Sequence, residues 1–263
     1  MCTSTRTGSL HLLLLFVSIT FLAVSSARTT TAQEFSWPED PENLKVLPAD
    51  VKGAKLGQVM RGFASTLGVR CEFCHVGEGP NLGLFDFASD EKLNKRKARV
   101  MIEMVKAINE SHLSELTSLE GLTTERIEVT CITCHRTQDK PVMLDDRLAS
   151  TIQSDGVDAA ITEYRDLREQ YYGGFAYDFS EGMLTGLGER LGAEENYDAA
   201  IKILGLEIEM NGESPSTFYT LGGVQGKAGL RDEAISTFEK GIELAPDGWR
   251  PFFQQEIDRL RQE

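Results

Sequence analysis

Apolar side chains recur at helical spacing in two stretches of the first half of the chain. The first stretch puts these residues on one face of a predicted helix: Leu56, Val59, Met60, Phe63 and Leu67. Asp50 is placed to cap the start of this helix, and Gly68 to end it. The second predicted helix runs from about Lys92 to Glu110, and its apolar face is formed by Ala98, Met101, Val105 and Ile108, with Met104 beside them.

A third pattern repeats every 34 residues in the last part of the chain. Leu187, Gly188, Ala200 and Leu204 recur as Leu221, Gly222, Ala234 and Phe238. This is the period of tetratricopeptide repeats, in which each copy is a pair of antiparallel helices. The run Asp158–Ile161 indicates a degenerate earlier copy, and Trp249–Leu260 a capping helix. Together the three patterns predict an all-α fold.

Each of the two helices in the first half precedes a C-x-x-C-H pentapeptide. The two copies consist of Cys71, Cys74 and His75, and of Cys131, Cys134 and His135. Such a pentapeptide is the attachment signature of haem c, because two thiols at this spacing bind the two vinyl groups of one porphyrin and the histidine ligates the iron. Two copies predict two covalently attached haems.

Cysteine pairs at this spacing also occur in redox-active disulfides and in zinc ribbons. A redox-active C-x-x-C is expected near a βαβ pattern, whereas the flanks of both pairs read as helical. A zinc ribbon with four thiolate ligands needs no histidine after each pair. The pattern therefore favours haem attachment, and the sequence shows no constellation of catalytic acids, bases or nucleophiles.

A methionine on each helix is the candidate for the second axial ligand of each iron. Met60 precedes the first motif, and Met101 holds the matching place before the second. A methionine paired with histidine gives a haem of raised potential that is suited to electron transfer. Met104 competes with Met101 for the second iron, and His112 is expected to be a surface residue.

Composition, charge and the N-terminus indicate where the protein works. The net charge is −14, so the basic surface of a nucleic-acid-binding protein is absent. Residues 1–27 read as a signal peptide with an apolar core from Leu10 to Val24, which predicts export to the bacterial periplasm, or membrane attachment only if the signal stays uncleaved. The predicted organisation continues with a linker (28–42), a dihaem cytochrome c domain (43–150) and a repeat domain (151–263).

Residues 43–142 resemble the photosynthetic reaction-centre cytochrome c subunit family. The resemblance rests on the strings Asn43–Leu47, Ala98–Asn109 and Val129–Arg136. It implies that each haem sits on a helix, a turn and a C-x-x-C-H motif, and that the helix supplies a methionine as sixth ligand. It selects Met101 over Met104 and supports Met60. The reaction-centre members of the family carry four such motifs, whereas this chain carries two.

The sequence thus predicts a periplasmic dihaem electron carrier that serves redox partner proteins. The repeats are expected to present a groove for a protein or peptide. The alternative function is that of a dihaem enzyme, peroxidase-like, in which one iron lacks its methionine and stays open to substrate.

Overall fold

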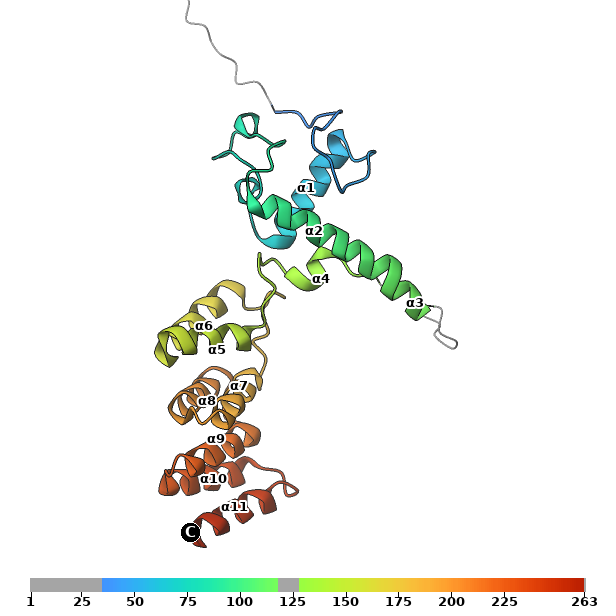
Figure 1. The fold of residues 1–263 in the computed structure, drawn as a ribbon. Helices are drawn as coiled ribbons and strands as arrows, with labels where there is room; N and C mark the ends of the chain where they lie inside the picture. The colour runs from blue at the N-terminus through green and yellow to red at the C-terminus, as the bar shows by residue number, and fades with distance from the viewer. Residues whose placement is uncertain (1–34, 118–127, 263) are drawn as a thin grey trace, which may run out of the picture. The chain divides into compact units, whose positions relative to one another are not determined.

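The computed structural model describes residues 35–117 and 128–262 (Figure 1). In these ranges the regular elements are helices, and the one β-type pairing is an isolated antiparallel bridge between Val76 and Asp86. The predicted all-α class is confirmed. The predicted signal peptide lies outside the described residues, and none of the helices within them is long and apolar enough to cross a membrane. All contacts discussed below lie within the compact unit Ser36–Glu263.

Helix α1 spans Gly53–Leu67 and ends at Gly68, as predicted. Gly68 adopts the left-handed conformation, with φ of 65°, and its Cβ position would lie 2.1 Å from the carbonyl oxygen of Thr137, so only glycine fits there. The predicted start was wrong. The N-cap residue is Lys52, and Asp50 forms an ion pair with Lys55 instead.

Helix α2 spans Leu93–Ala107 and continues through a π-helical turn, η3 (Ile108–His112), into the short helix α3 (Leu113–Thr117). Its N-cap residue is Lys92. Asp90 lies two residues before this N-cap, and its side chain joins the lead-in segment to α2. Its carboxylate accepts hydrogen bonds from Lys45 Nζ at 2.7 Å and from Arg99 Nη2 and Asn43 Nδ2 at 2.8 Å.

The basic residues at the start of α2 donate hydrogen bonds to backbone carbonyls in and near the first motif and the loop that follows it. Lys95 Nζ donates to the carbonyl oxygens of Phe87, Ala88 and Ser89 at 2.7–3.1 Å. Lys92 Nζ donates to the carbonyl oxygen of Glu72. These side chains therefore satisfy backbone carbonyls of a turn-rich segment, and this use of a basic cluster was not anticipated from the sequence.

The remaining elements are short turns around the motifs and then a stack of helical hairpins. The former are η1 (Cys71–Phe73), η2 (Leu82–Leu84) and α4 (Cys131–His135). The latter are α5 (Leu144–Asp155), α6 (Val157–Tyr171), α7 (Met183–Ala193), α8 (Tyr197–Asn211), α9 (Pro215–Lys227), α10 (Arg231–Leu244) and α11 (Arg250–Gln262). Helices α5 and α6, α7 and α8, and α9 and α10 pack as successive pairs (Figure 1). The predicted domain boundary at residue 150 falls inside α5.

The buried apolar side chains lie almost entirely within this stack. They form two clusters, one running from Leu144 to Val224 and one centred on Phe238 and Phe253. Among the described residues before Leu144, only Val51 and Leu56 belong to the buried apolar set. The segment that carries the two cysteine motifs therefore has very little apolar core of its own, whereas the hairpin stack has an extensive one.

Residues 34 positions apart make equivalent contacts in the stack. The Cβ position of Gly188 lies 2.5 Å from Leu204 Cγ, and that of Gly222 lies 2.6 Å from the ring of Phe238. Leu204 and Phe238 are fully buried. In each pair a glycine of the first helix admits a large side chain of the second helix, which allows the two helices to pack closely.

A substitution at Gly222 tests this contact. We expect Gly222→Ala to lower the free energy of unfolding of the stack by about 1–3 kcal/mol, because the added methyl group overpacks the buried Phe238 ring. Gly223→Ala is the matched control, because no atom lies within 4 Å of its Cβ position and alanine favours a helix by about 0.5–1 kcal/mol. Urea unfolding should separate the two variants. Equal stabilities would contradict the packing described.

The Asp90 contacts predict a pH dependence. Hydrogen bonds from Arg99 and then Lys45 hold the pKa of this carboxyl well below its ordinary value of 3.8. A depressed pKa stabilises the fold above the unfolded-state pKa, and this stabilisation is lost as the pH falls toward the folded-state pKa. Asp90→Asn should therefore destabilise the protein most at neutral pH, and the difference from wild type should narrow below about pH 4. Denaturant unfolding across this range is the measurement, and a difference independent of pH would refute the assignment.

Candidate haem-attachment site

The first cysteine pair lies on a single tight helical turn. The backbone N–H groups of Cys74 and His75 both donate to the carbonyl oxygen of Cys71, at 3.2 and 3.0 Å. Residues three apart on such a turn share a face, so the thiols of Cys71 and Cys74 point to the same side. The turn therefore presents the two sulfur atoms together, as two bonds to one porphyrin require.

The second pair lies on the five-residue helix α4, which begins after Thr130. A capping box closes its start, in which the Thr130 N–H donates to Thr133 Oγ1 at 3.0 Å. The chain then turns sharply, because Arg136 and Thr137 both have positive φ, and the Thr137 N–H donates to the Thr66 carbonyl oxygen at 2.9 Å. The exit of the second motif is thereby fixed to the end of α1.

Helix α2 contacts both motifs, one at each end. Near its start, Asn94 Nδ2 donates to the carbonyl oxygen of Phe73, between the first two cysteines, at 3.2 Å. Just past its end, Asn109 pairs with Val129 through Nδ2 to the carbonyl oxygen (2.7 Å) and through Oδ1 from the N–H (2.8 Å). A 15-residue helix is ~22 Å long at 1.5 Å per residue, so α2 sets the spacing of the two motifs.

The two histidines have different surroundings. His135 is buried and its Nδ1 lies 2.8 Å from the carbonyl oxygen of Gln138. Because a carbonyl only accepts, Nδ1 carries the proton, and Nε2 is left with the lone pair that binds a metal. His75 is half-buried, packs edge-on against Phe87 at 5.0 Å between ring centroids, and has a buried Nδ1 without a well-formed hydrogen bond.

Burial, aided by nearby positive charge, favours the neutral form of the His75 imidazole. Burial lowers the pKa of His75 to about 4, with Lys95 acting in the same direction and the Phe87 backbone opposing both. Imidazole must be neutral to bind a metal, so this state suits a ligand at neutral pH.

The thiols do not have the properties of a redox-active pair. All four are free and lie in the two motifs, and Cys134 is the most exposed. Burial raises the pKa of the Cys74 and Cys131 thiols, whereas reactive thiols of redox C-x-x-C motifs have a lowered pKa. In the part of the chain that the structure describes, no three His, Cys, Asp or Glu side chains come together as metal ligands.

The predicted methionines lie on the helices expected of them. Met60 is half-buried on α1, and Met101 is half-buried on α2. Met104, the competitor, also lies on α2 and is 42% exposed. The exposure difference supports Met101, although the assignment of both methionines as ligands stays a prediction. His112 is exposed, as expected of a surface residue.

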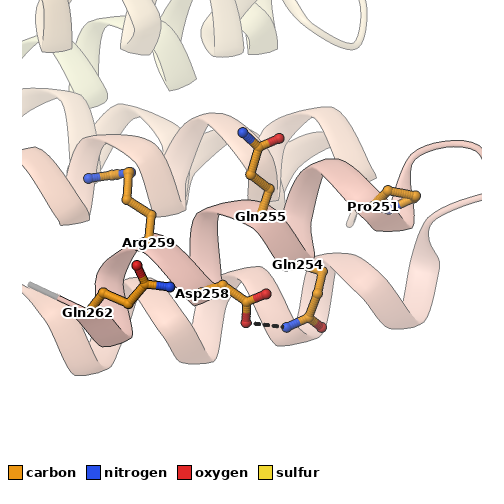
Figure 2. Close-up of a pocket in the computed structure, with 6 residues that line it drawn as sticks. All are labelled: Pro251, Gln254, Gln255, Asp258, Arg259 and Gln262. Atoms are coloured by element: carbon orange, nitrogen blue, oxygen red, sulfur yellow. Dashed lines mark hydrogen bonds between the residues drawn. The ribbon is translucent and has the colours of Figure 1, made fainter.

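A cavity of about 350 Å³ borders the second motif. Its lining includes Cys134, His135 and Gln138 together with Met143 and Tyr177. A separate, open hollow lies on the face of α11 and is lined by polar side chains and one proline (Figure 2): Pro251, Gln254, Gln255, Asp258, Arg259 and Gln262. It contains none of the predicted ligands and is a surface feature of the last helix.

The donor set therefore fits a covalently held haem at each motif. Each motif offers two thiols on one face and a histidine directly after them, and α1 and α2 carry half-buried apolar side chains. These are the features of a c-type cytochrome.

Comparison with known families agrees with this class. Residues 23–165, more than half of the chain, match the photosynthetic reaction centre cytochrome c subunit family, and the chain belongs to this family. Membership implies covalent haem c, electron transfer rather than an enzymatic reaction, and redox partners such as the reaction centre. A search of curated proteins found no match to the chain.

Several residues that build the site were not recognised from the sequence. The positions between the cysteines are among them, because Thr133 caps α4 and the carbonyls of Glu72 and Phe73 accept hydrogen bonds from the start of α2. Asn109 and Gln138 were also missed. An asparagine at the end of an apolar helix is a weak signal because it is a poor helix former, while Gln138 carries no local signal at all.

Asn109 gives the sharpest test of the site's framework. Asn109→Ala should cost about 1–3 kcal/mol in stability, because it leaves the half-buried Val129 N–H and carbonyl without partners. It should also lower the yield of haem attached at Cys131 and Cys134 while leaving the first motif unaffected. Peptide mass mapping of haem at each motif measures this, with Glu110→Ala as an exposed neighbouring control. Equal loss at both motifs would contradict a local role.

Proposed function

We propose that this protein is an electron carrier with two covalently attached haems. Cys71 and Cys74 would hold the first haem and Cys131 and Cys134 the second. His75 and His135 would each supply one axial ligand. The family match supports haem-based electron transfer, and the two separate cysteine motifs support the number two.

The observation that carries the proposal is the near absence of an apolar core among the described residues that bear the motifs. Among the described residues before Leu144, only Val51 and Leu56 are buried apolar residues, yet α1 and α2 both have a regular apolar face. A helix buries its apolar stripe against something. Two porphyrins held by the cysteines would provide that surface.

Met60 and Met101 are proposed as the second axial ligands. When bound, haem supplies a one-electron couple, and a methionine ligand raises its potential. The protein's own part would be to hold the two motifs at the spacing of α2, to keep His75 neutral by burial and to orient His135 through its Nδ1 hydrogen bond. The half-buried apolar side chains of α1 and α2 would supply apolar contacts to the porphyrins.

The hairpin stack is proposed to be a tetratricopeptide-like docking domain for a protein or peptide. The 34-residue equivalence of Gly188 with Gly222, and of Leu204 with Phe238, supports the repeat assignment. The net charge of −14 favours a partner with a basic docking surface through long-range attraction. The signal-like N-terminus supports export to the periplasm, where such partners and haem attachment would be found.

A redox titration of the full chain, produced with haem-attachment machinery, tests the proposal. We expect two haems per chain by mass and two low-spin irons in the oxidised protein. Met60→Ala and Met101→Ala should each lower the potential of one haem, and a different one in each case. Met104→Ala is the matched control on α2 and should leave both potentials unchanged.

Three outcomes would count against the proposal. A single haem per chain would refute the proposed number of two haems. A high-spin iron in the unmutated protein together with rapid peroxide turnover would indicate a dihaem enzyme. A drop in potential with Met104→Ala and none with Met101→Ala would move the second ligand to Met104.

A further inference from the structure

We propose that the segment 172–179, the first part of the connection from α6 to α7 in the hairpin stack, positions the His135 ligand of the second haem through Gln138. The inference rests on the proposed function, because it assigns a role toward the second haem. It concerns a part of the chain beyond residues 23–165, which match the family. A contact from there to a ligand histidine is therefore a feature of this chain and not of the matched region.

Two consecutive hydrogen bonds connect the ligand to this segment. His135 Nδ1 donates to the carbonyl oxygen of Gln138 at 2.8 Å, and Gln138 Nε2 donates to the carbonyl oxygen of Ala176 at 2.8 Å. His135 and Gln138 are each 9% exposed, so both bonds are shielded from water. A single residue thus uses its backbone to orient the imidazole and its side chain to hold that backbone in place.

The far end of this connection is rigid. Ala176 and Tyr177 are buried, and the ring of Tyr177 packs against those of Tyr171 and Phe179 at centroid distances of 5.5 and 6.2 Å. The Tyr177 hydroxyl also accepts a hydrogen bond from Arg147 Nη1 at 2.6 Å. Residues 176, 177 and 179 belong to the main apolar cluster of the stack. The orientation of His135 is therefore fixed by the core of the helical stack and not only by its own loop.

This arrangement matters chemically because the partner of a ligand's outer N–H tunes the metal. A carbonyl that accepts from Nδ1 makes Nε2 a better electron donor and holds the ring plane. A better donor stabilises the oxidised iron and so lowers the potential. His75 differs, because its buried Nδ1 has no hydrogen bond of good geometry and the polar group beside its ring is the Phe87 backbone. The two histidine ligands thus differ in how Nδ1 is hydrogen-bonded.

The test uses Gln138→Leu in the full-length protein with both haems attached. The variant keeps much of the side-chain volume but loses the donor to Ala176, so the Gln138 backbone should loosen and the bond from Nδ1 should weaken. We expect the potential of the second haem to rise while that of the first stays unchanged. A tenfold change in the ratio of oxidised to reduced iron corresponds to about 59 mV for one electron, and we expect a shift of up to that size. Asp139→Leu is the control, because Asp139 is exposed and has no part in the connection.

A second variant approaches the connection from the stack. Tyr177→Leu removes the bond to Arg147 and the ring contacts that hold Ala176, and leaves residue 138 intact. It should move the potential of the same haem in the same direction, and it keeps the proposal testable if Gln138→Leu does not fold. Electron paramagnetic resonance of the oxidised protein should show a change in the g-values of that haem alone. Circular dichroism should confirm that each variant retains its helices.

The outcomes separate this inference from the proposed function. Fewer than two haem waves in the unmutated protein would refute the dihaem carrier itself. If the redox titration resolves two haems, but the variants leave both potentials unchanged or shift both equally, only the role of segment 172–179 would be refuted. A shift confined to one haem in both variants, and absent with Asp139→Leu, supports it.

Discussion

Helix α2 is the element on which the rest of the first half depends. One helix of 15 residues contacts the first cysteine turn at its start, and its π-helical extension contacts the lead-in to the second. A helix is stiff along its axis, so the distance between the motifs does not vary with the loops around them. The carbonyls held by Lys92, Lys95 and Asn94 add to this, because they bind the irregular segments to the helix. An electron carrier with two centres needs such a fixed spacing, since transfer between them depends on their separation.

The two parts of the chain are stabilised in different ways. The hairpin stack buries a continuous set of apolar side chains, and its close helix packing depends on small residues such as Gly188 and Gly222. The cysteine-bearing part relies on polar side chains that satisfy backbone groups and on the Asp90 ion pairs. Few apolar side chains are buried in the described residues of this part, and a bound cofactor would bring it additional apolar surface.

Periodicity predicted the helices well because it reports which face of a helix is apolar. The apolar face of α1, its end at Gly68 and the existence of α2 follow from that pattern. The C-x-x-C-H motifs could also be recognised from the sequence, because all the residues of each motif are adjacent along the chain. Helix starts were harder to predict from the sequence. Asp50 and Asp90 have the right chemistry for N-caps, but nearby lysine and arginine side chains bind both carboxylates instead. The roles of Asn109 and Gln138 depend on partners 20 and 38 residues away, which no local pattern encodes.

The close approach of Gly68 to Thr137 has a consequence for the order of folding. Contacts within the hairpin stack join neighbouring helices, whereas this contact joins residues 69 positions apart along the chain. Loop closure over long separations is slow, so local hairpins form earlier than such distant contacts. The stack is then expected to form while the end of α1 and the exit of α4 are still apart. During that interval the four thiols are more open than in the finished fold, and an attachment enzyme would find both motifs on a chain whose C-terminal half is already ordered.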